Sequence, residues 1–109
     1  MRRWRLALPA MAIIALVVAA LNYGSPGTRA FRISMEAEKL SRPGKFHEAI
    51  KAYSDAIQLE PKYVQRYVWR ARDFERTGDH DHALADLDTA IRLQPDYTEA
   101  FIKIGRAHV

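Results

Sequence analysis

The stretch GKFHEAIKAYSDAIQLEP occupies residues 44–61 of this chain, and GDHDHALADLDTAIRLQP occupies residues 78–95. The two stretches begin thirty-four residues apart and share one Gly, two Ala, one Ile, one Leu and the closing Pro. Apolar residues recur in both at steps of three and four, so each is predicted to form an amphipathic helix that ends before its Pro. Two helices in the same phase indicate a structural repeat.

The neighbouring residues follow the same helical pattern. The spacing predicts helices over about 30–40, 46–59, 64–76 and 80–93, and a fifth that begins near Thr98. Gly44 and Gly78 lie beyond helix ends, where a left-handed backbone is wanted. The inward faces are expected to consist of Ile33, Ala37, Leu40, Ala49, Tyr53, Ala56, Ile57, Tyr67, Ala71, Phe74, Ala83, Leu87, Ala90 and Ile91.

A helix-turn-helix unit of 34 residues, with small residues at the helix crossings and Pro after the second helix, resembles the tetratricopeptide repeat. The resemblance implies an all-α fold of tandem helical hairpins, an α-solenoid. It assigns a first repeat to residues 30–63, a second to 64–97 and the start of a third to 98–109. Glu36 and Arg70 stand where the family usually has Leu. We expect Glu36 to weaken the first repeat, and Arg70 to pack its stem while its charged group reaches solvent.

The N-terminus carries a membrane-type signal over residues 1–24. Leu6 to Tyr23 contain no charge, are apolar all round, and would form a helix about 27 Å long. Three arginines precede this segment, which predicts that its first end stays in the cytoplasm and that the repeats are exported. We favour an uncleaved signal anchor because the segment is long for a signal peptide; the alternative is cleavage after Ala20. Residues 25–29 are predicted to be a flexible linker.

Composition excludes several functional classes. The net charge is +4, but three of the 17 basic residues precede the apolar segment, leaving 14 basic against 13 acidic residues of alternating sign. Such a pattern lacks the basic stripe of a nucleic-acid-binding protein. There is no Cys, no phosphate-binding glycine loop and no nucleophile–base motif. We therefore expect no enzymatic activity, no cofactor and no small-molecule substrate.

One short stretch, Gly78 to His82, has the residue types of a metal site. However, His80 and His82 are two residues apart at a helix start and point to different faces, whereas zinc needs three or four converging ligands. We expect no metal there. Asp79 is expected to cap the helix that follows.

The resemblance implies that the first helix of each repeat lines a groove that binds peptides. Trp and Arg contribute strongly to binding energy at interfaces, so we expect a peptide ligand to bind through the Trp69–Arg72–Arg76 stripe. The alternative is that Trp69 packs against a third repeat and the arginines are solvated. The site residues on which we rely are Met35, Glu38, Val68, Trp69, Arg72 and Arg76; the further groove positions are Phe31, Ser34, Arg42 and Gln65.

These features together predict a membrane-tethered or exported scaffold that binds a partner protein or peptide. The alternatives are a soluble periplasmic or secreted protein after signal cleavage, and the non-catalytic N-terminal part of a larger enzyme. The third repeat stops inside its first helix, so we expect the chain to be a fragment. Ile104 to Val109 resemble one reading frame of a common sequencing adapter; chance is the alternative, since Gly105 and Ala107 suit the repeat.

Overall fold

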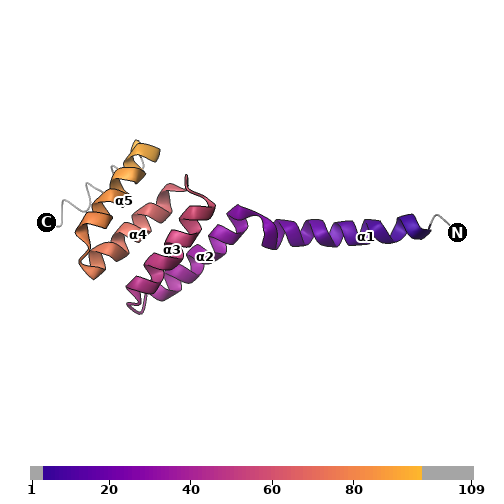
Figure 1. The fold of residues 1–109 in the computed structure, drawn as a ribbon, viewed down its shortest axis with the longest axis horizontal. Coiled ribbons are helices and arrows are strands. Elements are labelled where there is room, and N and C mark those ends of the chain that lie inside the picture. The colour runs from indigo at the N-terminus through magenta and orange to yellow at the C-terminus, as the bar shows by residue number, and fades with distance from the viewer. Residues whose placement is uncertain (1–3, 97–109) are drawn as a thin grey trace.

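The computed structural model of this protein describes residues 4–96, and within them every regular element is helical (Figure 1). The all-α prediction is therefore confirmed for this part of the chain. The elements are α1 (Trp4–Ala19), the π-helical turn η1 (Ala20–Gly24), α2 (Pro26–Ser41), α3 (Phe46–Leu59), α4 (Val64–Thr77) and α5 (His80–Leu93). The predicted fifth repeat helix, from Thr98, lies outside the described residues.

The turns inside the two hairpins explain why α3 and α5 begin where the sequence pattern predicts. Gly44 and Gly78 have φ values of +94° and +83°, which a residue with a side chain rarely adopts. Gly78 ends α4, and its N–H bonds back to the carbonyls of Phe74 and Glu75. Asp79 then caps α5 as expected, because its side chain accepts a hydrogen bond from the backbone N–H of His82 at 3.3 Å.

The start of α2 differs from the prediction. Residues 26–29, predicted as part of a flexible linker, are instead the first turn of this helix. Ser25 is the N-cap, and its hydroxyl accepts a hydrogen bond from the Thr28 N–H at 3.1 Å. Pro26 follows at the first helical position, where its missing N–H costs nothing. The Ser-Pro pair thus acts as a helix start, and the only residue between η1 and α2 is Ser25.

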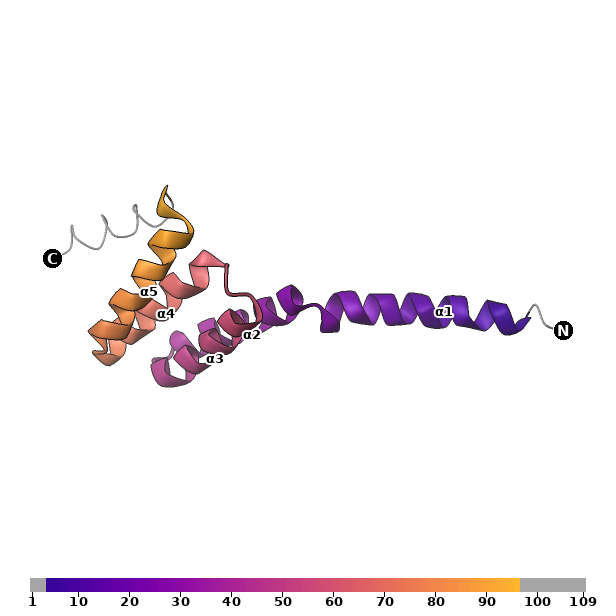
Figure 2. The same cartoon turned by 45° about the horizontal axis from the view of Figure 1, so that its top comes forward.

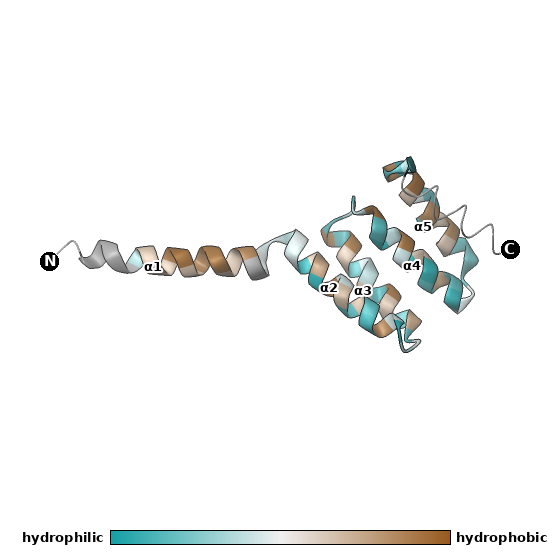
Figure 3. Cartoon of the chain, turned by 180° about the vertical axis from the view of Figure 1, so that it is seen from behind, coloured by the Kyte–Doolittle hydropathy of each residue, from teal (hydrophilic) through white to brown (hydrophobic). Residues whose placement is uncertain are grey.

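The N-terminal segment also differs from the uninterrupted helix expected over residues 6–23. α1 has 16 residues and gives way to the π-helical turn η1 at Ala20. Side chains from Pro9 to Leu21 are all exposed, and the helix projects away from the hairpins as a largely apolar rod (Figure 3). Within residues 4–96, no helix has both the length and the hydropathy needed to cross a membrane.

The four remaining helices form two stacked hairpins. α2 packs on α3, α4 packs on α5, and α3 packs on α4 to join the hairpins (Figures 1 and 2). Alanines at the crossings are fully buried, as predicted, because a small side chain lets two backbones approach closely. The predicted inward alanines with no exposed surface are Ala37, Ala49, Ala56, Ala83 and Ala90, and Ala30, which was not predicted to face inward, is equally buried.

Two apolar clusters fill the space between these crossings. One contains Ala37, Ala49 and Tyr53, and the other contains Ile57, Val64, Tyr67 and Ala90. Ile91, predicted to face inward, is exposed instead. Its counterpart Ile57, which follows Ala56 in the same way, is buried because it packs with Val64 and Tyr67 of α4, the helix that follows α3. The residues from 97 onward, which follow α5, lie outside the described part of the chain.

The second hairpin buries an ion pair where the repeat pattern favours Leu. Arg70 of α4 donates to both carboxylate oxygens of Asp86 on α5, at 2.6 and 2.8 Å, and to Ser54 Oγ at 3.0 Å. The two charged side chains are only 19% and 7% exposed. The expectation that the charged group of Arg70 reaches solvent is therefore wrong, because Asp86 provides an internal partner. Glu36, by contrast, is exposed and pairs with Lys39 at 3.2 Å.

This buried pair generates a stability prediction. Arg70→Leu should lower the free energy of unfolding by about 2–4 kcal/mol, because it leaves the carboxylate of Asp86 buried without its partner. The double variant Arg70→Leu/Asp86→Leu should recover most of that loss, since no buried charge remains. Urea unfolding of the full chain in detergent measures the double variant and both single variants, Arg70→Leu and Asp86→Leu. A double variant that is destabilised by the sum of the two single changes would show that the pair is not coupled.

Candidate functional site

An open cleft of about 270 Å³ lies between α2 and α4. It forms because the first helices of the two hairpins lie on the same face of the stack. Phe31 and Met35 of α2 stay exposed at the cleft, while the fully buried Tyr53 of α3 contributes to its lining from below. The lining residues are Phe31, Ser34, Met35, Glu38, Arg42, Tyr53, Tyr63, Arg66, Trp69 and Arg72.

Most of the predicted groove residues therefore meet in one place, but three do not. Val68 packs against the cluster that contains Ile57 and Val64. Arg76 places its guanidinium over the ring of Phe46, 5.7 Å from the ring centre, rather than in the cleft. Gln65 lines a different hollow. Val68 precedes Trp69 by about 100° of rotation and so points to the core, whereas the end of α4 brings Arg76 to the start of α3.

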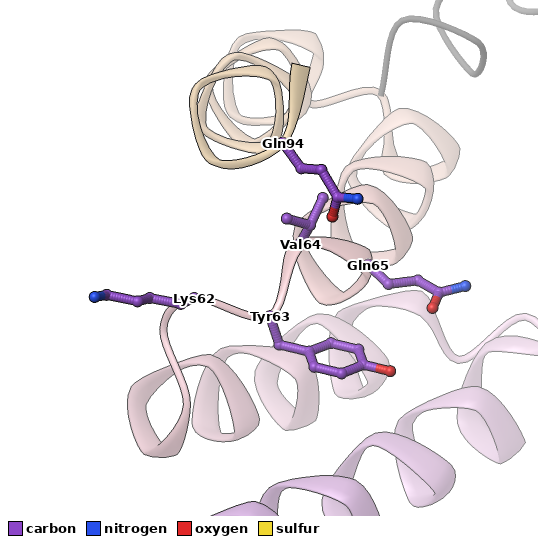
Figure 4. Close-up of a pocket in the computed structure, with 5 residues that line it drawn as sticks. All are labelled: Lys62, Tyr63, Val64, Gln65 and Gln94. Atoms are coloured by element: carbon purple, nitrogen blue, oxygen red, sulfur yellow. The ribbon is translucent and has the colours of Figure 1, made fainter. Parts of the chain in front are cut away.

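That other hollow is a shallow depression of about 300 Å³ at the turn between α3 and α4. Figure 4 shows Val64 and Gln94 facing it while Lys62 extends away. Its lining residues are Lys62, Tyr63, Val64, Gln65 and Gln94. Its lining contains a single charged side chain, that of Lys62.

Sequence reasoning missed Arg66, which is 2% exposed and yet lines the cleft. Its Nε donates to Ser34 Oγ and its Nη1 donates to Glu60 Oε1, both at 2.7 Å. Its guanidinium also lies 4.2 Å from the centre of the Tyr63 ring. The signal was the spacing, because Arg66 precedes Trp69 by three residues on the same helix face.

Trp69 forms one wall of the cleft. Its ring packs on Tyr53 of the first hairpin, with ring centres 5.9 Å apart and a tilt of 35°. It also joins the cluster of Ala37, Ala49 and Tyr53 while remaining half-buried. Packing in the described structure is therefore toward the first repeat. The start of the third repeat lies outside the described residues, so the alternative that Trp69 packs against it stays a prediction.

Glu38 connects the three helices that surround the cleft. Its Oε2 accepts hydrogen bonds from Arg72 Nη2 at 3.0 Å and from the Tyr53 hydroxyl at 3.1 Å, and its Oε1 lies 3.6 Å from Arg42 Nε. Desolvation alone would raise the pKa of Glu38, but the hydrogen bonds from Arg72 and Tyr53 and the nearby arginine charges lower it below 4.5. Burial and the hydrogen bond to Glu38 raise the pKa of Tyr53. At neutral pH the carboxylate is thus charged and the phenol is a neutral donor.

Behind the cleft, Asp73 ties α4 to the end of α2. It has no exposed surface, and its Oδ1 accepts a hydrogen bond from Ser41 Oγ at 2.7 Å. Its Oδ2 has no partner among the described residues, and the nearest cation is Arg72, with Nε 3.8 Å from Oδ1. Burial raises the pKa of Asp73 above 3.8, although the hydrogen bond from Ser41 and the charge of Arg72 oppose this change.

The histidines near the second turn bind separate acidic partners. His80 Nδ1 lies 2.8 Å from Glu75 Oε2, and His82 Nδ1 lies 2.7 Å from Asp79 Oδ2. The ring of His82 stacks on Phe74, with centres 5.1 Å apart. No group of three metal-ligating side chains occurs in the part of the chain that the structure describes.

Comparison with known families agrees with the helical repeat. The family described as Tetratricopeptide repeat matches residues 35–98 and, in a second overlapping match, residues 70–109. The matches together span residues 35–109, which is more than half of the chain and includes α3, α4, α5 and the part of α2 from Met35 onward. No curated protein sequence matches this chain.

The burial of Asp73 leads to a pH prediction. Because its pKa is raised in the folded state, the folded protein binds this proton more readily than the unfolded chain does. The contribution of Asp73 to stability therefore falls as pH rises from 3.8 through the raised pKa. Asp73→Asn keeps an acceptor for Ser41 but cannot ionise. Its stability relative to the wild type should therefore increase as pH rises from 3.8 through the raised pKa of Asp73.

Urea unfolding of the wild type and Asp73→Asn, measured at several pH values in that range, tests this expectation. Parallel stability curves for the two proteins would contradict it, since they would mean that Asp73 titrates equally in both states.

Proposed function

Because the chain belongs to the tetratricopeptide-repeat family, we propose that it is a non-catalytic scaffold that holds a partner protein through a peptide bound between α2 and α4. The observation that carries this proposal is the combination of exposed Phe31 and Met35 with half-buried Trp69 at one open cleft. Apolar side chains that gather around a depression gain free energy when a partner covers them. Trp and Arg, both present here, are the residue types that contribute most to interfaces.

The size and chemistry of the cleft also favour a peptide. A volume of about 270 Å³ lies below the usual range for enclosed sites of drug-sized molecules, and it suits a few side chains of an extended or helical segment. The ionisable groups here are held in hydrogen-bonded pairs, such as Glu38 with Arg72. Such pairs are suited to recognising a charged partner rather than to exchanging protons with a substrate.

A matched pair of apolar truncations tests the peptide site. Phe31 lines the cleft and is 62% exposed, whereas Leu84 lies on α5 and is 63% exposed. Peptides are first selected from a displayed random library on the full chain in detergent. Phe31→Ala should then weaken their binding by about 1–2 kcal/mol, while Leu84→Ala should leave it unchanged.

Isothermal titration gives both affinities, and thermal unfolding checks that each variant is folded. Failure to select any peptide, or equal affinities for Phe31→Ala and the wild type, would contradict the proposed function.

We further propose that α1 anchors the protein in a membrane with the repeats on the exported side. The support is that exposed apolar side chains surround α1, among them Met11, Ile14 and Leu16. Exposure of so many apolar groups to water is unfavourable. The arginines at positions 2, 3 and 5 match the bias toward a cytoplasmic N-terminus. α1 alone is about 24 Å long, so insertion requires local bilayer thinning or a contribution from η1. Cleavage after Ala20, with release of the repeats, remains the alternative.

A charge placed in α1 tests the anchor. Wild-type protein should resist alkaline extraction from membranes and carry a C-terminal reporter that is active only after export. Leu16→Arg should reduce membrane retention, because an arginine near the centre of a short span costs about 2.5–3.5 kcal/mol. The control is Leu84→Arg, which places the same charge on α5. Extraction of the wild type at high pH would contradict anchoring, and a mature mass without residues 1–20 would show cleavage instead.

A further inference from the structure

We infer that the cleft binds acidic peptides, and that Glu38 is an internal carboxylate that the carboxylate of such a peptide displaces from Arg72. The inference rests on the proposed function, because it assigns a ligand class to the same cleft. Its support is the charge of the lining residues, the hydrogen bonds that Glu38 already occupies, and the spacing of the arginines along α4.

The charged side chains of the cleft are mostly cationic. The lining contains three arginines, Arg42, Arg66 and Arg72, against one carboxylate, Glu38. Two carboxylates offset these charges from outside the cleft: Glu60 pairs with Arg66, and the buried Asp73 lies 3.8 Å from Arg72 Nε, so the positive excess is confined to the groups that line the cleft. Arg42 carries this excess at the rim, since its side chain is 78% exposed and its Nε is 3.6 Å from Glu38. A positively charged depression favours a negatively charged partner.

Two of these arginines offer hydrogen-bond donors inside the cleft. Arg66 uses Nε for Ser34 and Nη1 for Glu60, and its Nη2 makes no hydrogen bond within the described residues. Among the described residues, the only fully buried side-chain atom without a hydrogen-bond partner is Asp73 Oδ2, so Arg66 Nη2 keeps contact with solvent and can be reached by a ligand. A carboxylate is the acceptor that matches the geometry of a guanidinium group. Arg72 donates from Nη2 to Glu38, and that donor becomes available to a ligand whenever Glu38 moves away.

Glu38 occupies the position that a ligand carboxylate would take. Its Oε2 binds both Arg72 and the Tyr53 hydroxyl, which are the convergent donors at this end of the cleft. Its Oε1 is already near Arg42, one helical turn further along α2, so a small rotation transfers the carboxylate to that exposed arginine. An acidic ligand can replace the lost contact to Arg72, whereas a neutral or basic ligand cannot. Glu38 therefore adds selectivity at some cost in affinity.

The spacing on α4 predicts the arrangement of the ligand. Arg66 and Arg72 are six residues apart, which is about 9 Å along the helix axis, with Trp69 between them. An extended peptide covers that distance in about three residues. The expected ligand has two acidic residues about three positions apart, separated by an apolar side chain that packs against Trp69 and, across the cleft, Met35.

The experiment uses the full chain in detergent and the displayed random peptide library. Sequences selected on the wild type should be enriched in Asp and Glu and depleted in Lys and Arg. The strongest binders are then synthesised, and their affinities are measured for matched variants. Arg42→Gln and Arg92→Gln remove the same charge from exposed arginines that each pair with a carboxylate four residues earlier, but Arg92 lies on α5 outside the cleft.

Arg42→Gln should weaken binding of the acidic peptides about two- to fivefold, as expected for an exposed ion pair, and Arg92→Gln should leave it unchanged. Glu38→Gln should strengthen binding about two- to fivefold, because it removes the competing charge while it keeps the shape of the side chain. The gain from Glu38→Gln distinguishes displacement from a structural role, since loss of a merely structural contact would weaken binding or leave it unchanged.

Three failures can be told apart. Peptides that bind the cleft, lose affinity for Phe31→Ala and show no acidic enrichment would overturn the inference while the proposed function stands. Absence of any peptide whose binding depends on Phe31 would overturn both. Acidic peptides that bind Glu38→Gln no better than the wild type would overturn the inference that the ligand carboxylate displaces Glu38 from Arg72.

Discussion

The position of α2 against α4 depends on a row of polar contacts between residues about one repeat apart. Ser34 accepts from Arg66 at 2.7 Å, Glu38 accepts from Arg72 at 3.0 Å, and Ser41 donates to Asp73 at 2.7 Å. Hydrogen bonds are directional, so these three contacts specify one alignment of the two helices. Apolar packing alone specifies such an alignment less strictly. The cleft exists because this row holds two helices side by side without filling the space above them.

The same arrangement makes α4 unusual for a helix at the centre of a stack. It carries Arg66 and Asp73 on the side toward α2 and Arg70 on the side toward α5, and all three are largely withdrawn from water. Burying a charge is unfavourable unless partners satisfy it. Arg66 and Arg70 find such partners, whereas Asp73 has a hydrogen-bond partner, Ser41, for only one of its two oxygens. Polar contacts in the core therefore connect the two repeats as well as the helices within the second one. A change at the cleft is expected to alter the fit between the hairpins.

The apolar end of the cleft is also its N-terminal end. Phe31 lies five residues after the first residue of α2, and α2 begins directly after η1 and α1 (Figure 1). The charged end, with Glu38 and Arg42, lies near the turn of the first hairpin. A peptide in the cleft therefore meets Phe31 at one end and the exposed Arg42 at the other, with Arg66, Trp69 and Arg72 along α4 between them, which gives the proposed site a direction.

The repeat pattern by itself was sufficient to predict the all-α fold and the bounds of α3 and α5. Two phased amphipathic stretches, each bounded by Gly and Pro, leave little freedom for local structure. The repeat pattern also predicted most of the residues that line the cleft, because residues on one helix face recur at steps of three and four. It did not identify the roles of Arg66, Arg70 or Val68. A charged residue at an inward position is normally assigned to solvent, and only the tertiary structure places Glu60, Ser34 and Asp86 beside these arginines. The cleft residue Glu38 likewise finds its partners on α3 and α4, because helix packing brings together side chains that lie fifteen and thirty-four residues away in the sequence.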